Sequence, residues 1–120
     1  SVLAYSSGAV VLIDQKLEAS FCNYPNPFGT SARPETRFVY YLQQSSALEL
    51  KIFTLTGALV FSWDLKKAEH PAETSAGLHD GDIYWDGRNG RGQRVMSGVY
   101  LAYLSVEGGQ VAISKIAVIR

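Results

Sequence analysis

Residues 48–65 carry the sequence LELKIFTLTGALVFSWDL. In its first half, leucine and isoleucine alternate with glutamate and lysine, which is typical of a strand with one buried face. Thr56-Gly57 supplies a tight turn, and apolar residues then recur at every second position as far as Leu65. This stretch therefore predicts a β-hairpin whose two strands turn the same face toward a core.

The rest of the chain has the same strand character, with short apolar runs bounded by Gly, Pro, Asn or Ser. No window keeps the apolar spacing of an amphipathic helix, and the polar segment from Lys66 to Ala76 is predicted to be a loop. We therefore expect an all-β, immunoglobulin- or fibronectin-III-like antiparallel sandwich of about seven strands. The further strand candidates are Ala9–Ile13, Leu17–Phe21, Thr36–Leu42, Ile83–Trp85, Val99–Val106 and Val111–Ile119.

The expected core consists of the residues on the inward faces of these strands. It comprises Phe38, Tyr40, Leu50, Ile52, Phe61, Trp63, Trp85, Gly98 and Tyr100. Cys22 is the only cysteine, which excludes a disulfide within the chain, and it is interpreted as a small buried apolar side chain.

Length and charge restrict the class of protein. A chain of 120 residues suits one domain, and we place that domain at residues 17–120, with residues 1–16 as the end of a preceding domain, a linker or a first strand. Eleven basic residues balance eleven acidic ones, so no nucleic-acid partner is expected. No apolar run approaches the roughly 18 residues that span a membrane.

Reaction chemistry finds little support in the sequence. The two histidines, His70 and His79, are not accompanied by a Gly-x-Ser-x-Gly motif, so we expect no enzyme and no cofactor. No metal site is predicted, although Asp80, Asp82 and Asp86 are the residues that could contribute to one. Their spacing is not that of an EF-hand, and we interpret them as a solvated strand face.

Two other features have a structural and a functional interpretation. The glycines between Gly87 and Gly92 fit a hairpin turn better than a phosphate-binding loop, because no Gly-Lys-Ser/Thr follows them. Tyr41, Tyr84 and Tyr103 lie at outward positions, where they would form a sugar-binding platform or cover the sheets.

A series of motifs resembles a known superfamily. The segment Asn23-Tyr24-Pro25-Asn26-Pro27-Phe28 is followed in order by TRFVYYL (36–42), LKIFTLTGALV (50–60), WDGRNGRG (85–92), SGVY (97–100) and KIAVIR (115–120). The series resembles the type A C-terminal sorting domains of the type IX secretion system and the related immunoglobulin-like domain of the flagellar hook-capping protein. Gly81-Asp82 departs from the pattern as an insertion, which we interpret as a specialised loop.

The resemblance implies a non-catalytic sorting or anchoring module at the C-terminal end of a larger exported bacterial protein. It implies the rest of that polypeptide and the outer-membrane secretion machinery as partners, and a location at the cell surface or outside the cell, reached through the periplasm. The alternatives are a structural spacer or adhesive module and a flagellar hook-assembly domain. The expected recognition residues are Asn23, Pro25, Asn26, Pro27, Phe28, Lys115 and Arg120, because an exposed terminal strand can be recognised by strand addition.

Overall fold

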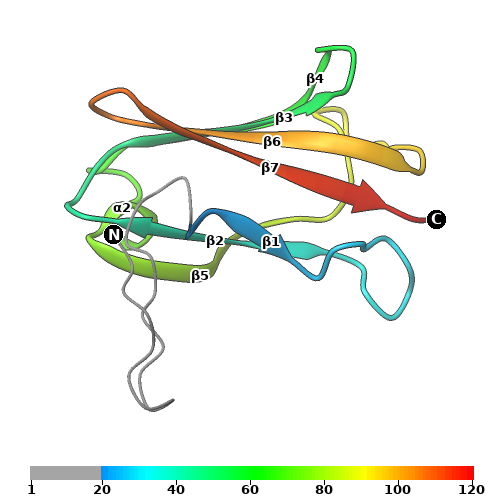
Figure 1. The fold of residues 1–120 in the computed structure, drawn as a ribbon, viewed down its shortest axis with the longest axis horizontal. Coiled ribbons are helices and arrows are strands. Elements are labelled where there is room, and N and C mark those ends of the chain that lie inside the picture. Colours follow the sequence, from blue (N-terminus) through cyan, green and yellow to red (C-terminus); the bar gives the residue numbers. More distant parts are fainter. Residues whose placement is uncertain (1–19) are drawn as a thin grey trace, which may run out of the picture.

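The computed structural model describes residues 20–120, which form two antiparallel β-sheets facing each other (Figure 1). The predicted all-β sandwich is thereby confirmed. The predicted strand Ala9–Ile13 lies outside the described residues. The predicted strand Leu17–Phe21 lies partly outside them, and in its described part Ser20 is helical and pairing begins only at Cys22.

The smaller sheet has the strand order β1-β2-β5. Its strands are β1 (Cys22–Tyr24), β2 (Thr36–Leu42) and β5 (Gly77–Trp85). β5 begins six residues earlier than the predicted Ile83–Trp85, because Gly77–Asp80 also pairs with β2.

The larger sheet has the strand order β4-β3-β6-β7. It contains the predicted hairpin of β3 (Leu48–Thr54) and β4 (Leu59–Leu65), and a second hairpin of β6 (Gly98–Val106) and β7 (Gln110–Val118). β3 pairs with β6 and joins the two hairpins into one sheet.

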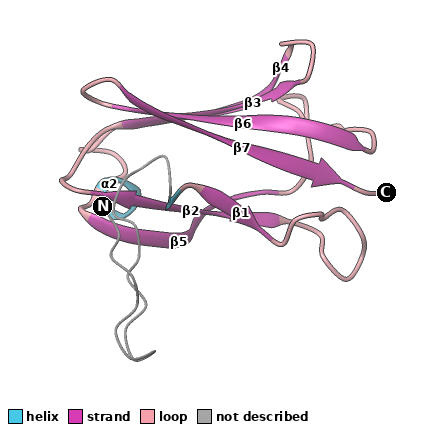
Figure 2. Cartoon of the chain, viewed as in Figure 1, coloured by secondary structure: helices cyan, strands magenta, loops and turns pink. Residues whose placement is uncertain are grey.

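The expectation of an irregular loop from Lys66 to Ala76 is wrong in part, because the short helix α2 (Pro71–Thr74) interrupts it (Figure 2). Proline suits the first turn of a helix, since its missing N–H has no helical partner there. Thr74 is buried, and its hydroxyl donates to the carbonyl of His70 at 2.7 Å. Within residues 20–120, no helix has the length and apolar character needed to cross a lipid bilayer.

The core lies between the sheets, where alternate residues of β2, β3 and β6 are buried and β5 and β7 each contribute three buried residues. Its largest side chain is Trp85, which contacts Phe28 and Tyr100 edge-on. The expected core residues that are buried are Phe38, Tyr40, Leu50, Ile52, Trp85 and Tyr100.

Three expected core residues differ. Phe61 and Trp63 are only partly buried, because β4 is the outermost strand of the wider sheet and the opposite sheet has one strand fewer. Gly98 is exposed, since the chain is still entering the sheet at the first position of β6.

Candidate functional site

The proline-rich segment Asn23–Phe28, hereafter the strap, crosses from the smaller sheet to the free edge of β7. The side chain of Asn26 bridges two backbone groups of that edge. Its Nδ2 donates to the carbonyl of Lys115 at 2.8 Å, and its Oδ1 accepts from the amide of Ala117 at 2.9 Å. Because Pro25 and Pro27 have no N–H, the asparagine amide replaces the peptide group that a paired strand would present.

Phe28 extends this contact with its own backbone. Its N–H donates to the carbonyl of Ala117 at 3.0 Å, and its carbonyl accepts from Ile119 at 2.8 Å, as in a short parallel pairing with Val118. The backbone groups that point outward between Lys115 and Ile119 are therefore occupied. The chain's own strap covers this part of the edge, so the expected recognition by strand addition would require the strap to be displaced.

Asn23, the first residue of the strap, connects it to both sheets through side-chain hydrogen bonds. Its side chain is buried, its Nδ2 donates to the hydroxyl of Thr36 at 3.0 Å, and its Oδ1 accepts from the hydroxyl of Ser114 at 2.8 Å. Thr36 in turn donates to the carbonyl of Pro25 at 2.8 Å. These bonds join β1, β2, β7 and the strap through polar groups that need partners once they are buried.

Arg120 closes the same end of the sandwich. Its backbone N–H donates to the hydroxyl of Ser97, while its guanidinium donates through Nε to the carbonyl of Val95 at 2.9 Å and through Nη2 to that of Gly87 at 2.8 Å. Removal from water lowers the pKa of Arg120, and the nearby Arg94 and Arg88 add to the effect. The side chain is therefore fixed by the loop that precedes β6.

Among the seven residues expected to take part in recognition, the structure brings the strap and residues 115–120 together. Asn23 and Phe28 are buried, Pro25 is partly buried, and the exposed members are Asn26, Pro27, Lys115 and Arg120. The exposed members therefore lie on the outer surface of the strap, on β7 and at Arg120.

The three aspartates predicted on a solvated strand face are exposed, Asp80 and Asp82 on β5 and Asp86 directly after it, but they do not converge. Asp82 bonds to His79, and Asp86 accepts from the backbone N–H of Arg88 at 3.2 Å. Within residues 20–120, no three His, Cys, Asp or Glu side chains come close enough to hold a metal ion.

Gly81-Asp82 forms a bulge in β5, and the expectation of a specialised loop there is wrong. Arg37 pairs with Tyr84, and Val39 pairs with Asp80, so β5 has two more residues than β2 over this interval. Gly81 has φ +90°, and a Cβ there would lie 3.2 Å from Cδ of Arg37. A glycine is favoured because it allows this conformation at low cost.

The bulge brings Asp82 to a buried histidine. Nδ1 of His79 lies 2.6 Å from Oδ2 of Asp82, and Nε2 lies 2.7 Å from the carbonyl of Ser75. Both partners accept hydrogen bonds, so a ring protonated on both nitrogens satisfies both contacts. Neither ring nitrogen faces a hydroxyl or thiol, as a nucleophile's base would.

Tyr40 stacks on the ring of His79 at 4.6 Å between centroids, and its hydroxyl donates to the carbonyl of Glu73 at 2.6 Å. Burial raises the pKa of Tyr40 well above its usual range, and the charges of Asp82 and Glu73 raise it further. The cluster around His79 therefore anchors α2 to the smaller sheet.

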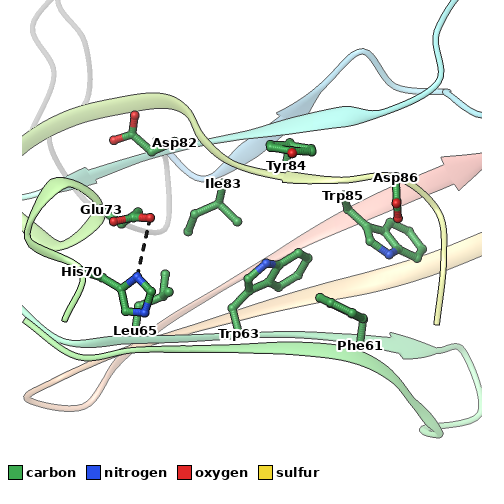
Figure 3. A pocket seen from close by; sticks show the side chains of 10 residues that line it. All are labelled: Phe61, Trp63, Leu65, His70, Glu73, Asp82, Ile83, Tyr84, Trp85 and Asp86. Carbon is green, nitrogen blue, oxygen red and sulfur yellow. Dashed lines mark ion pairs between the residues drawn. The ribbon is translucent and has the colours of Figure 1, made fainter. Parts of the chain in front are cut away.

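A groove of about 300 Å³ lies between β4 and β5 on the open side of the sandwich. Figure 3 shows Phe61 and Trp63 of β4 pointing toward Ile83 and Trp85 of β5, with Glu73 at one end. The groove was not predicted from the sequence. The two aromatic residues on one face of the predicted strand, Phe61 and Trp63, could have indicated it. Its chemistry suits contact with a ring or an apolar side chain.

The outward tyrosines do not form one platform. Tyr84 is exposed at the rim of the groove, while Tyr41 and Tyr103 are partly buried and lie on different sheets.

Cys22 is exposed, so the prediction of a buried thiol is wrong: Asn23 takes the inward position of β1. Partial burial, followed by the charge of Asp80, raises the pKa of the thiol.

The three-stranded and four-stranded sheets, with a strap that crosses from one to the other, define an immunoglobulin-like sandwich. No protein-family model and no curated protein sequence matches the chain.

Two solved structures from Porphyromonas gingivalis contain a domain similar to this chain. One is PorZ, an essential bacterial surface component of the type IX secretion system, with 24% identity, a TM-score of 0.55 and 83% of this chain covered. The other is dimeric latent PorU, with 22% identity, a TM-score of 0.60 and 83% covered. The chain spans only 11% of PorZ and 9% of PorU, and the likeness shows a shared fold.

Proposed function

We propose that the domain is a non-catalytic sorting or anchoring module of a larger exported bacterial protein, which the type IX secretion system carries to the cell surface. The observation that carries this proposal is the fold shared with a domain of PorZ over 83% of the chain. The ordered motifs from Asn23 to Arg120 support it, because they resemble sorting domains of the same system.

The geometry supports a particular mode of recognition. Since the strap occupies the backbone of β7 between Lys115 and Ile119, a receptor would contact side chains there. Tyr24 is 63% exposed, Pro27 is exposed on the strap, and Lys115, whose carbonyl accepts from Asn26, is also exposed. These three side chains form the recognition surface in our proposal, and the hydrogen bonds beneath them hold it rigid.

The test fuses the complete 120-residue chain to the C-terminus of a reporter with a signal peptide, in a host that has the type IX machinery. We expect the reporter at the cell surface or in the medium. The same reporter without the chain, and the fusion in a host lacking the translocon, should remain in the periplasm. Periplasmic retention of a folded fusion in the competent host would refute the sorting role and favour a structural spacer.

A charge reversal tests the recognition surface. Lys115→Glu changes an exposed side chain beside the strap, and Lys66→Glu is a matched change at an exposed position in the connection after β4. We expect the first variant to reduce surface delivery and the second to leave it unchanged. Equal delivery of both variants would show that Lys115 is not recognised, whether or not the domain sorts.

A further inference from the structure

The end of the sandwich near Arg120 contains a cleft of about 360 Å³. One wall is the connection from the strap to β2, and the other is the glycine-rich connection between β5 and β6 together with Arg120. Six of the residues that line the cleft matter for its chemistry: Thr30, Ser31, Asp86, Arg88, Arg94 and Arg120.

The cleft carries an excess of positive charge in a chain with equal numbers of acidic and basic residues. Its three guanidinium groups face a single carboxylate, that of Asp86, which lies 3.7 Å from Nε of Arg88. The guanidinium of Arg94 makes no hydrogen bond or ion pair with the residues from 20 to 120. The lowered pKa of Arg120 reflects partial burial and the closeness of Arg94 and Arg88.

Two of the three guanidinium groups, those of Arg120 and Arg88, are held in place. Two donors of Arg120 bond to the carbonyls of Val95 and Gly87, and Nη1 of Arg88 bonds to the carbonyl of Gly92 at 2.8 Å. A guanidinium has five N–H groups, so each side chain keeps donors for a ligand while its orientation is fixed. Such preorganisation lowers the entropy cost of binding.

We propose that this cleft binds an oxyanion, a phosphate or carboxylate group carried by a larger molecule. Arginine is suited to both groups, since its planar donors match two oxygens at once. The anion offsets the repulsion between the guanidinium groups, and the hydroxyls of Thr30 and Ser31 on the opposite wall supply further polar contacts. The site stands on charge and geometry alone and is independent of the sorting role.

The experiment is an NMR titration of the complete chain at constant ionic strength, with inorganic phosphate and glucuronate as separate probes and chloride as the reference. We expect saturable shifts of the amides in residues 29–31 and 87–95. Arg94→Gln should weaken binding about tenfold, the equivalent of one charge-assisted hydrogen bond. Arg91→Gln is the matched control, because Arg91 belongs to the same connection but does not line the cleft.

The two probes distinguish the source of the anion. Saturation by phosphate alone indicates a phosphate-bearing ligand, and saturation by glucuronate alone indicates an acidic sugar. Either result supports the site. The proposal is overturned if neither probe gives saturable shifts at concentrations on the order of 10 mM. It is also overturned if the two arginine variants weaken binding equally, since that result reflects general charge attraction.

Discussion

The side chain of Asn26 covers the free edge of β7, and both its Nδ2 and its Oδ1 make hydrogen bonds there. Asn26→Asp keeps an oxygen for the amide of Ala117 but replaces the donor with a charged oxygen facing the carbonyl of Lys115. Because two acceptors then oppose each other, we expect the free energy of unfolding to fall by about 1–2 kcal/mol at pH 7. Urea denaturation followed by circular dichroism measures this change.

A second amide provides the control for Asn26. Gln43→Glu makes the same chemical change at an exposed position in the turn after β2, and we expect it to leave stability within about 0.5 kcal/mol of the parent. If Asn26→Asp were equally harmless, the bonds from Asn26 to β7 would not hold the edge in solution.

Tyr40 makes stability depend on pH in the alkaline range. Burial, Asp82 and Glu73 raise its pKa in the folded state, while the unfolded side chain loses its proton near pH 10. Above that pH the folded state binds more protons than the unfolded state. Stability is therefore complete below about pH 10 and falls as pH rises, by at most about 1.4 kcal/mol per pH unit from this group.

The variant Tyr40→Phe removes that proton and should flatten the alkaline decline. At pH 7 the variant loses only the hydrogen bond to Glu73, at a cost of about 1 kcal/mol. Urea midpoints measured from pH 8 to about pH 11 separate the two effects. An identical alkaline slope in parent and variant would mean that the proton of Tyr40 does not contribute.

At the scale of elements, the close approach of the strap to β7 depends on Gly29. A Cβ at this position would lie 2.4 Å from the carbonyl oxygen of Ile119, and the residue has φ +121°. Gly57, in the turn between β3 and β4, has φ +96°, but a Cβ added there would meet no atom within 4 Å. The two glycines therefore share the conformational requirement but differ in the available space.

Replacing each glycine with alanine separates these two costs. Gly57→Ala should lower the free energy of unfolding by about 1 kcal/mol, the cost of a left-handed conformation. Gly29→Ala should lower it by about 3 kcal/mol or more, because the strap must also move away from β7. Thermal unfolding of both variants provides the comparison, and equal losses would contradict the tight contact.

The elements that the sequence predicted best are strands with clear apolar alternation, including β2, whose observed bounds equal the predicted ones although its partner β5 is distant in sequence. The hairpin of β3 and β4 and the hairpin of β6 and β7 follow from alternation on both sides of a short turn. β1 and α2 were missed because neither has a full period: β1 has three residues, with Asn23 in the inward position. The bulge at Gly81 was visible as two extra residues, but only pairing with β2 shows that they stay within a strand.

The candidate site was predicted only in part, for a similar reason. The strap and residues 115–120 were singled out separately, but their contact joins residues 89 positions apart in sequence. No local pattern could indicate that Asn26 bonds to Lys115. The arginine cleft was equally hidden, because Arg88 and Arg94 are near neighbours in sequence whereas Arg120 reaches them only through the fold.

At the scale of the whole molecule, the two sides of the sandwich are closed differently. On one side the strap joins β1 to β7, and Arg120 lies against the connection before β6. On the other side the edges of β4 and β5 leave the groove shown in Figure 3. The closed side should therefore contribute more to stability than the open side.

Two tryptophans that line the groove differ in burial and in contact with the strap. Trp85 is 1% exposed, contacts Phe28 and Tyr100, and donates through Nε1 to the carbonyl of Arg88 at 2.8 Å. Trp63 is partly buried beside the groove. Trp85 also lines the inner wall of the groove, but it is buried and contacts Phe28 of the strap, so Trp85→Ala removes a core side chain at an expected cost of about 3–5 kcal/mol.

Trp63→Ala should cost about 1–2 kcal/mol, since part of that side chain is already in contact with water. Urea denaturation gives both values, and Trp85→Phe supplies a milder change if the alanine variant does not fold.

With the phenylalanine variant, the loss of the bond to Arg88 should loosen the connection that carries the arginine cleft. Weaker phosphate or glucuronate binding by Trp85→Phe, with unchanged binding by Trp63→Ala, would show that the bond from Trp85 to Arg88 supports the cleft. If Trp63→Ala were as costly as Trp85→Ala, the deeper burial of Trp85 and its contact with Phe28 of the strap would add nothing to stability.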